Sequence, residues 1–136
     1  MIKYKDGYRY QLVEDYTIQT PIKPLVTIAK PPYYVLTTDG MLYIRAGFAW
    51  DGASGPTFDT PSSMRPSLVH DALCQMMEDR KLDYKTWSPT VHRFFKELCI
   101  EDGMSPIRAW IWHQGVIIGQ GGNPDIEDDN PVQTAP

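Results

Sequence analysis

The stretch AGFAWDGASGPTFDTPSSMRP, residues 46–66, divides the chain into two halves with different hydrophobic periods. Before it, apolar and polar residues alternate, which is the period of strands that have one buried face. After it, apolar residues recur at the spacing of helices. The sequence therefore predicts an α+β fold, in which a small antiparallel, strand-rich N-terminal half packs against about three C-terminal helices.

The first half is predicted to form short strands, because its apolar side chains occupy even positions: Tyr8, Tyr10, Leu12, Tyr16 and Ile18. Four prolines interrupt this pattern, and they predict strands that end there or lie at a sheet edge: Pro21, Pro24, Pro31 and Pro32. Asp39-Gly40 separates the apolar runs 33–37 and 41–46. This pair predicts a tight hairpin, because it accepts the positive φ angles of the turn.

Proline signals predict the helix starts of the second half. Pro66 suits the first turn of a helix over 66–79, and Ser88-Pro89 suits the start of a helix over 89–101 that Gly103 ends. Ser105-Pro106 repeats the signal. It predicts a third helix whose tryptophans pack in the core and which also carries Ile107, Ile111 and Ile118.

Length and composition predict one domain, since the chain has 136 residues, 42% of them hydrophobic. We assign residues 1–122 to this domain, with strands mainly in 1–50, a functional loop at 51–65 and helices in 66–122. A loop of this length within a compact domain is usually functional. Residues 123–136 are predicted to be an acidic tail, because they are rich in Asp and Glu and nearly free of large apolar residues.

Charge and hydropathy exclude several protein classes. Thirteen Lys and Arg against 17 Asp and Glu give a formal net charge of −4, so nucleic acid is not an expected partner. No apolar run reaches the length of a membrane span, and MIKYKDGYRY lacks the apolar core of a signal peptide. Synthesis in the cytosol is expected. Two cysteines are too few for a disulfide scaffold, which favours two buried thiols over a bridge.

Two polar groups are candidates for chemistry. Asp51 and Ser54, spaced i and i+3 after an expected strand, form either a turn that satisfies the backbone or part of a catalytic site. His70-Asp71 lies within an otherwise apolar helical segment, so both side chains need partners. His70 is then a general base, a metal ligand or a hydrogen-bonded core residue. These alternatives stay open at the level of the sequence.

A metal site is a further hypothesis. His70 and Cys74 are spaced i and i+4, and His92 and Cys99 are two helical turns apart, so each pair shares a helix face. Together they offer two nitrogens and two thiolates for a structural zinc, although their spacing matches no familiar zinc finger. In a related hypothesis, a divalent metal ion that activates water is bound by His70 and His92 together with Asp51 and Asp71.

Three motifs resemble a phage-associated family known as domain of unknown function thirteen-fifty-three. They are GFAWDGASGP, then VHDALC about twenty residues later, and then VHRFFKELCIEDGM before a tryptophan-rich helix. The resemblance covers roughly Ile44 to Gly119. It implies a phage or prophage origin and, carried over by position, it singles out Asp51, Ser54, His70 and Asp71.

The chain departs from the family pattern at three positions. Gly55 stands where the family usually has an aliphatic residue, and Cys74 stands where tyrosine is usual, so Cys74 is not a ligand that the family shares. His92 takes the place of a helix aspartate, although Asp83 lies nearby and offers a carboxylate. Replacing aspartate by histidine keeps the ability to hydrogen bond or to bind a metal ion.

The sequence leaves two functions open. In the first, the chain is a small phage hydrolase in which Ser54 or a water molecule attacks, His70 is the base and Asp51 or Asp71 orients it. In the second, it is a non-enzymatic virion, assembly or host-interaction protein, and the same four residues form a buried network. A phage or host protein is then the expected partner, in the host cytoplasm or in the virion.

Overall fold

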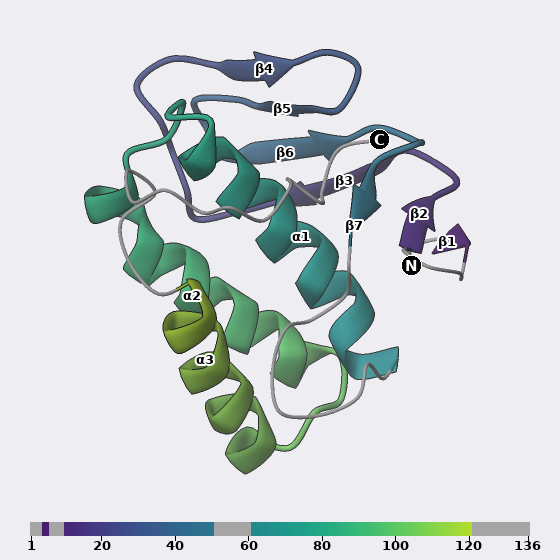
Figure 1. Ribbon diagram of the computed structural model, residues 1–136, viewed down its shortest axis with the longest axis vertical. Coiled ribbons are helices and arrows are strands. Elements are labelled where there is room, and N and C mark those ends of the chain that lie inside the picture. Colours follow the sequence, from purple (N-terminus) through teal and green to yellow (C-terminus); the bar gives the residue numbers. More distant parts are fainter. Residues whose placement is uncertain (1–3, 6–9, 51–60, 121–136) are drawn as a thin grey trace.

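The computed structural model describes residues 4–5, 10–50 and 61–120, and it confirms the predicted α+β fold (Figure 1). Strands occupy the N-terminal half and three helices the C-terminal half. The strands are β1 (Tyr4–Lys5), β2 (Tyr10–Leu12), β3 (Tyr16–Gln19), β4 (Ile28–Lys30), β5 (Tyr34–Leu36), β6 (Met41–Ile44) and β7 (Ala49–Trp50). The helices are α1 (Pro61–Glu78), α2 (Tyr84–Glu101) and α3 (Pro106–Gln120).

The described strands form two antiparallel sheets. One has the order β3-β6-β5-β4, and the smaller one has the order β1-β2-β7. β3 and β4 are the edges of the larger sheet, and each ends within two residues of a proline, as predicted. In β3, Thr17 and Gln19 are exposed while Tyr16 and Ile18 are half-buried, which confirms the period of two.

The predicted hairpin is formed by β5 and β6, with Leu36 opposite Leu42. Its turn differs in detail from the expectation, because only Gly40 has a positive φ, of 91°. A Cβ atom on Gly40 would lie 2.4 Å from the backbone oxygen of Thr20. The glycine is therefore required both by its backbone angle and by the close approach of the neighbouring chain.

Two of the predicted helix starts are wrong. Helix α1 begins at Pro61, five residues before Pro66, so the expected loop at 51–65 gives way to helix after residue 60. Helix α2 begins at Tyr84, and its N-cap is Asp83, whose Oδ2 accepts a hydrogen bond of 2.8 Å from the Thr86 amide. A carboxylate cap outweighs the Ser88-Pro89 signal. Pro66 and Pro89 then lie in the second turns of α1 and α2, where each removes one backbone hydrogen bond and crowds the carbonyl four residues earlier.

The end of α2 and the start of α3 follow the prediction. Gly103 has a φ of 107°, and the amide of Met104 donates to the Cys99 carbonyl at 2.9 Å, which closes the helix in a Schellman motif. Ser105 caps α3, because its Oγ accepts from the Arg108 amide at 3.2 Å. A short turn therefore reverses the chain between α2 and α3.

The core has two parts. The larger cluster joins the sheets to α1 and to part of α2, with Trp50, Leu68 and Leu73 fully buried. The smaller cluster lies between α2 and α3, where Phe95 packs beside Trp112. Trp110 is 56% exposed, so only one of the two α3 tryptophans packs in the core as predicted. None of the described helices is long and apolar enough to cross a membrane.

Candidate functional site

The contact between α1 and α2 contains a pair of histidines. His70 of α1 and His92 of α2 are joined by a 2.9 Å contact between Nε2 and Nδ1. One of these nitrogens donates and the other accepts, and the tautomers decide which. This contact explains how His70, a polar residue within an otherwise apolar segment of α1, is accommodated. His92 therefore provides the hydrogen bond expected of a residue in that position.

Helix packing brings the two rings together. The His70 ring lies 5.0 Å from the ring centres of both His92 and Phe95, so an aromatic side chain closes one side of the pair. His92 is only 4% exposed, whereas His70 remains partly exposed. The pair thus consists of a buried imidazole and an imidazole that keeps some contact with solvent.

Burial keeps both imidazoles neutral. It lowers the pKa of His70 to about 3, and the nearby charges of His92 and His113 act in the same direction. Burial also lowers the pKa of His92 to about 4, with a further contribution from His113. At neutral pH both rings therefore carry a lone pair that accepts a proton or a hydrogen bond.

Cys74 and Asp71 lie on the same helix as His70. The Cys74 sulfur is 3.6 Å from Nε2 and 3.7 Å from Nδ1 of His70. Burial raises the pKa of the Cys74 thiol well above its usual value, and the charges of Asp71 and Glu78 raise it further. Cys74 is therefore a protonated thiol, and together with Cys99 it confirms the prediction of two buried thiols without a disulfide.

The described chain reaches this site from β7. The indole nitrogen of Trp50 donates to Ser67 Oγ at 2.9 Å, and that hydroxyl donates to the Met64 carbonyl at 2.9 Å. Ser67 lies one turn before His70 and Asp71 on α1. Trp50, the last described residue before the glycine-rich segment 51–60, is thus held one helical turn from His70. Asp51 and Ser54 lie outside the described residues.

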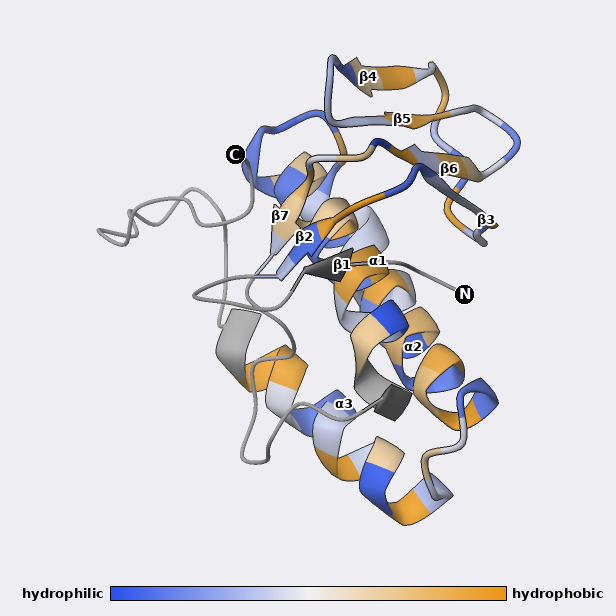
Figure 2. Ribbon diagram, turned by 90° about the vertical axis from the view of Figure 1, so that its right-hand side faces the viewer, coloured by the Kyte–Doolittle hydropathy of each residue, from blue (hydrophilic) through white to orange (hydrophobic). Residues whose placement is uncertain are grey.

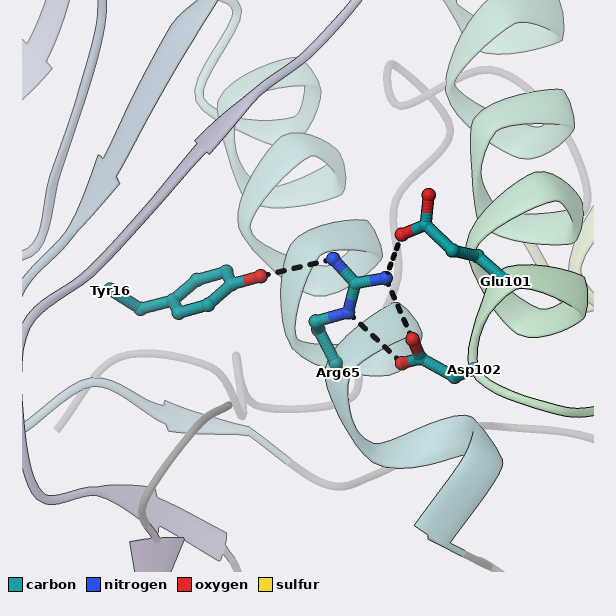
Figure 3. A network of polar contacts seen from close by, with 4 residues as sticks. All are labelled: Tyr16, Arg65, Glu101 and Asp102. Atoms are coloured by element: carbon teal, nitrogen blue, oxygen red, sulfur yellow. Dashed lines mark hydrogen bonds and ion pairs between the residues drawn. The ribbon is translucent and has the colours of Figure 1, made fainter.

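An arginine that the sequence did not single out fixes the N-terminal part of α1. Arg65 donates from Nε to one carboxylate oxygen of Asp102 at 3.0 Å and from a terminal nitrogen to the other at 2.7 Å. It also contacts Glu101 and, at 3.2 Å, the hydroxyl of Tyr16, as Figure 3 shows. These carboxylates raise the pKa of Arg65. Its partners lie more than 30 residues away, so no local spacing indicated the network.

The structure does not bring the four hypothesised zinc ligands together. In the parts of the chain that the structure describes, no three His, Cys, Asp or Glu side chains are arranged to hold a metal ion. Cys99 belongs to the cluster between α2 and α3, whereas Cys74 belongs to the main core. A shared helix face was a sound inference for each pair, but the two faces place their thiols in different clusters.

Comparisons with known proteins do not assign the chain to a family. No family model matches the chain, and no curated protein and no solved structure is significantly similar to it. Membership of the phage-associated family therefore stays a prediction that rests on the quoted motifs.

Proposed function

We propose that the chain is a small hydrolase, encoded by a phage or prophage, in which His70 is the general base. The observation that carries the proposal is the 2.9 Å contact between His70 Nε2 and His92 Nδ1. It gives a partly exposed imidazole a fixed orientation, which is what a general base needs. The nucleophile is Ser54 or a water molecule, as the residue types near the motif suggest.

The protonation state of the pair sets a condition on this role. Burial lowers the pKa of His70 to about 3, so the ring is unprotonated at neutral pH but is a weak base, and it needs a carboxylate such as Asp51 or Asp71 to stabilise its protonated form. In this proposal His70 donates its Nε2–H to His92. The Nδ1 atom of His70 then keeps the lone pair that takes the proton of the attacking hydroxyl. The proton then passes to the leaving group as the acyl bond breaks.

His92 is a positioning residue in this proposal. It is buried, it touches His70 through one nitrogen, and Phe95 closes the neighbouring side. A buried acceptor fixes the tautomer and the ring plane of the base, as the carboxylate does in a catalytic triad. A neutral imidazole stabilises a protonated His70 less than a carboxylate does. The chain should therefore be a slower catalyst than a relative with aspartate at this position.

The position of the pair also supports the proposal. Trp50 is hydrogen-bonded to Ser67, one helical turn from His70, and the sequence segment that contains Asp51 and Ser54 begins at the next residue. A polar segment that begins beside a candidate base supports an active site at this place. The substrate class is a carboxylic ester or amide, the bonds that such a base and nucleophile cleave.

A fluorophosphonate reagent and chromogenic carboxyl esters test the proposal. If serine is the nucleophile, the reagent should modify Ser54. If a water molecule is the nucleophile, the folded protein should hydrolyse the esters faster than the unfolded protein does. We expect His70→Ala to lower either rate at least ~100-fold, as the loss of a general base does. Glu97→Ala is the matched control, since it removes an exposed side chain of α2 outside the pair.

His70→Gln serves as a second variant, because glutamine retains a hydrogen-bonding group beside His92. Its free energy of unfolding shows whether a lost rate reflects lost folding. If the folded protein neither reacts with the reagent nor hydrolyses an ester, or if His70→Ala leaves the rate unchanged, the hydrolase is rejected. The non-enzymatic virion, assembly or host-interaction protein then becomes the better proposal.

A further inference from the structure

Helix α3 has an apolar face that points away from the rest of the described chain. Ile107 and Ile118 are each 76% exposed, Trp110 is 56% exposed, and Ile111 and Ile117 are 42% and 43% exposed. At 100° per residue these five positions fall within an arc of about 120°. We call them the outer face of α3. Ala109, Trp112 and Val116, on the opposite side, are buried in the cluster that α3 shares with α2.

We propose that the outer face of α3 binds the same face of a second copy of the chain across a two-fold axis. A surface helix normally has a polar side toward water, whereas the exposed side of α3 carries five large apolar residues around the half-buried Gln114. In Figure 2, α3 lies at the edge of the molecule and contains both apolar and polar segments. A helix of this kind is expected to be covered on both sides. In the described chain, α2 covers only one of them.

The area of the outer face suits a dimer. The exposed fractions of its residues add up to nearly three whole side chains, or about 600 Å² at roughly 200 Å² for a large side chain. That is the upper end of what a monomer usually exposes in one apolar patch. Two such faces together would bury about 1,200 Å², which reaches the range of specific interfaces.

The lack of charge favours a second copy over other partners. Arg108 is the only Asp, Glu, Lys or Arg in α3, and its guanidinium lies over the Trp112 ring at 5.9 Å, beside the buried side. An uncharged face meets its own copy without repulsion, as a two-fold interface requires. Binding to an anionic lipid surface needs a row of Lys and Arg, which α3 does not have.

The remaining C-terminal sequence is poorly suited to cover the outer face. Residues 123–136 contain two large apolar residues, Ile126 and Val132, among four acidic ones. The outer face presents five large apolar side chains. A second copy of α3 matches that number, and the tail does not.

Sedimentation velocity of the full chain over a concentration series tests the proposal. We expect a monomer–dimer equilibrium that Ile107→Lys/Ile118→Lys weakens at least ~30-fold, the effect of losing a central interface contact. Leu25→Lys/Val26→Lys is the matched control, because Leu25 is 99% and Val26 70% exposed on a different surface. The control should dimerise like the wild type, and circular dichroism should show both variants folded.

Three results would overturn the proposal. One is a wild type that stays monomeric at the highest concentration, and another is a dimer that the outer-face variant leaves intact. The third is a monomeric wild type that dimerises once Ile126→Ser/Val132→Ser is introduced, since the tail would then be the occupant. Ile111→Cys supplies an independent test. Oxidation should join two copies through this residue, because position 111 lies near the middle of the face along the helix axis and both native cysteines are buried.

Discussion

Helices α1 and α3 both bury apolar side chains against α2, but they lie in different surroundings. From Met64 to Met77, most residues of α1 are buried, because the sheets cover one side and α2 covers the other. Helix α3 is covered by α2 on one side only, and its outer face is exposed. An apolar helix needs a partner on each side. The comparison shows that α1 finds both partners within the described chain, whereas α3 finds one.

The largest expected effect compares a core leucine of α1 with an outer-face isoleucine of α3. Leu68→Ala should lower the free energy of unfolding by about 2–5 kcal/mol, since Leu68 is fully buried and the change leaves a cavity. Ile107→Ala should change it by at most about 0.5 kcal/mol in dilute monomer. Urea unfolding measures both. An equal loss at Ile107 would mean that the outer face is covered within a single chain.

The second prediction concerns pH and applies to the α1 side of the comparison. The pKa values of His70 and His92 in the fold, about 3 and about 4, lie below the ordinary histidine value of 6.5. Between these values the unfolded chain binds protons that the folded chain does not. The free energy of unfolding should therefore fall as the pH drops from 6.5 to 4, by on the order of 5 kcal/mol for the pair.

A double variant isolates this contribution. Carboxylates such as Asp39 and Asp83 have lowered pKa values in the fold, so protonating them in acid also lowers the free energy of unfolding. The wild-type curve alone therefore does not isolate the histidines. His70→Gln/His92→Gln should have a shallower dependence over the same range. Urea unfolding at pH 7, 6, 5 and 4 supplies the difference. Parallel curves for the two proteins would contradict the burial of the pair.

Local patterns predicted the fold well because they depend on neighbouring residues. The alternation of apolar residues placed the strands, Asp39-Gly40 placed the hairpin, and Ser105-Pro106 placed the start of α3. The same reasoning was wrong at Pro66 and Pro89. Both prolines lie in the second turn of their helices despite the backbone hydrogen bond that each removes, and Asp83 provides a cap six residues before Pro89, the predicted start of α2.

The site depends on contacts between distant residues, which a single sequence does not contain. His70 and His92 were each candidates, but their contact follows from the way α1 packs on α2. Arg65 was missed because Asp102 and Tyr16 reach it from other elements. The exposure of Trp110 could not be predicted either, because the apolar spacing in α3 does not indicate which side of the helix packs on α2.

The third prediction tests how α1 is held on its sheet side. Ser67→Ala removes the acceptor of the Trp50 indole, and both side chains are buried. A buried donor without a partner costs about 1–3 kcal/mol. Ser67→Cys has nearly the same size and restores a weak acceptor, so it should recover part of the loss. Urea unfolding followed by tryptophan fluorescence measures the change, and an unchanged midpoint for Ser67→Ala would show that the bond contributes little.

The smallest expected effect compares the caps of α2 and α3. Asp83→Ala removes the 2.8 Å hydrogen bond to the Thr86 amide and should lower the free energy of unfolding by about 1 kcal/mol. Because α2 joins both clusters, hydrogen exchange should become faster at amides throughout the core. Ser105→Ala removes the longer 3.2 Å bond to the Arg108 amide. Since α3 is held on one side only, this loss should appear as faster hydrogen exchange in α3 alone. Equal and global losses from both variants would mean that α3 unfolds only with the whole chain, and that its second side is already covered.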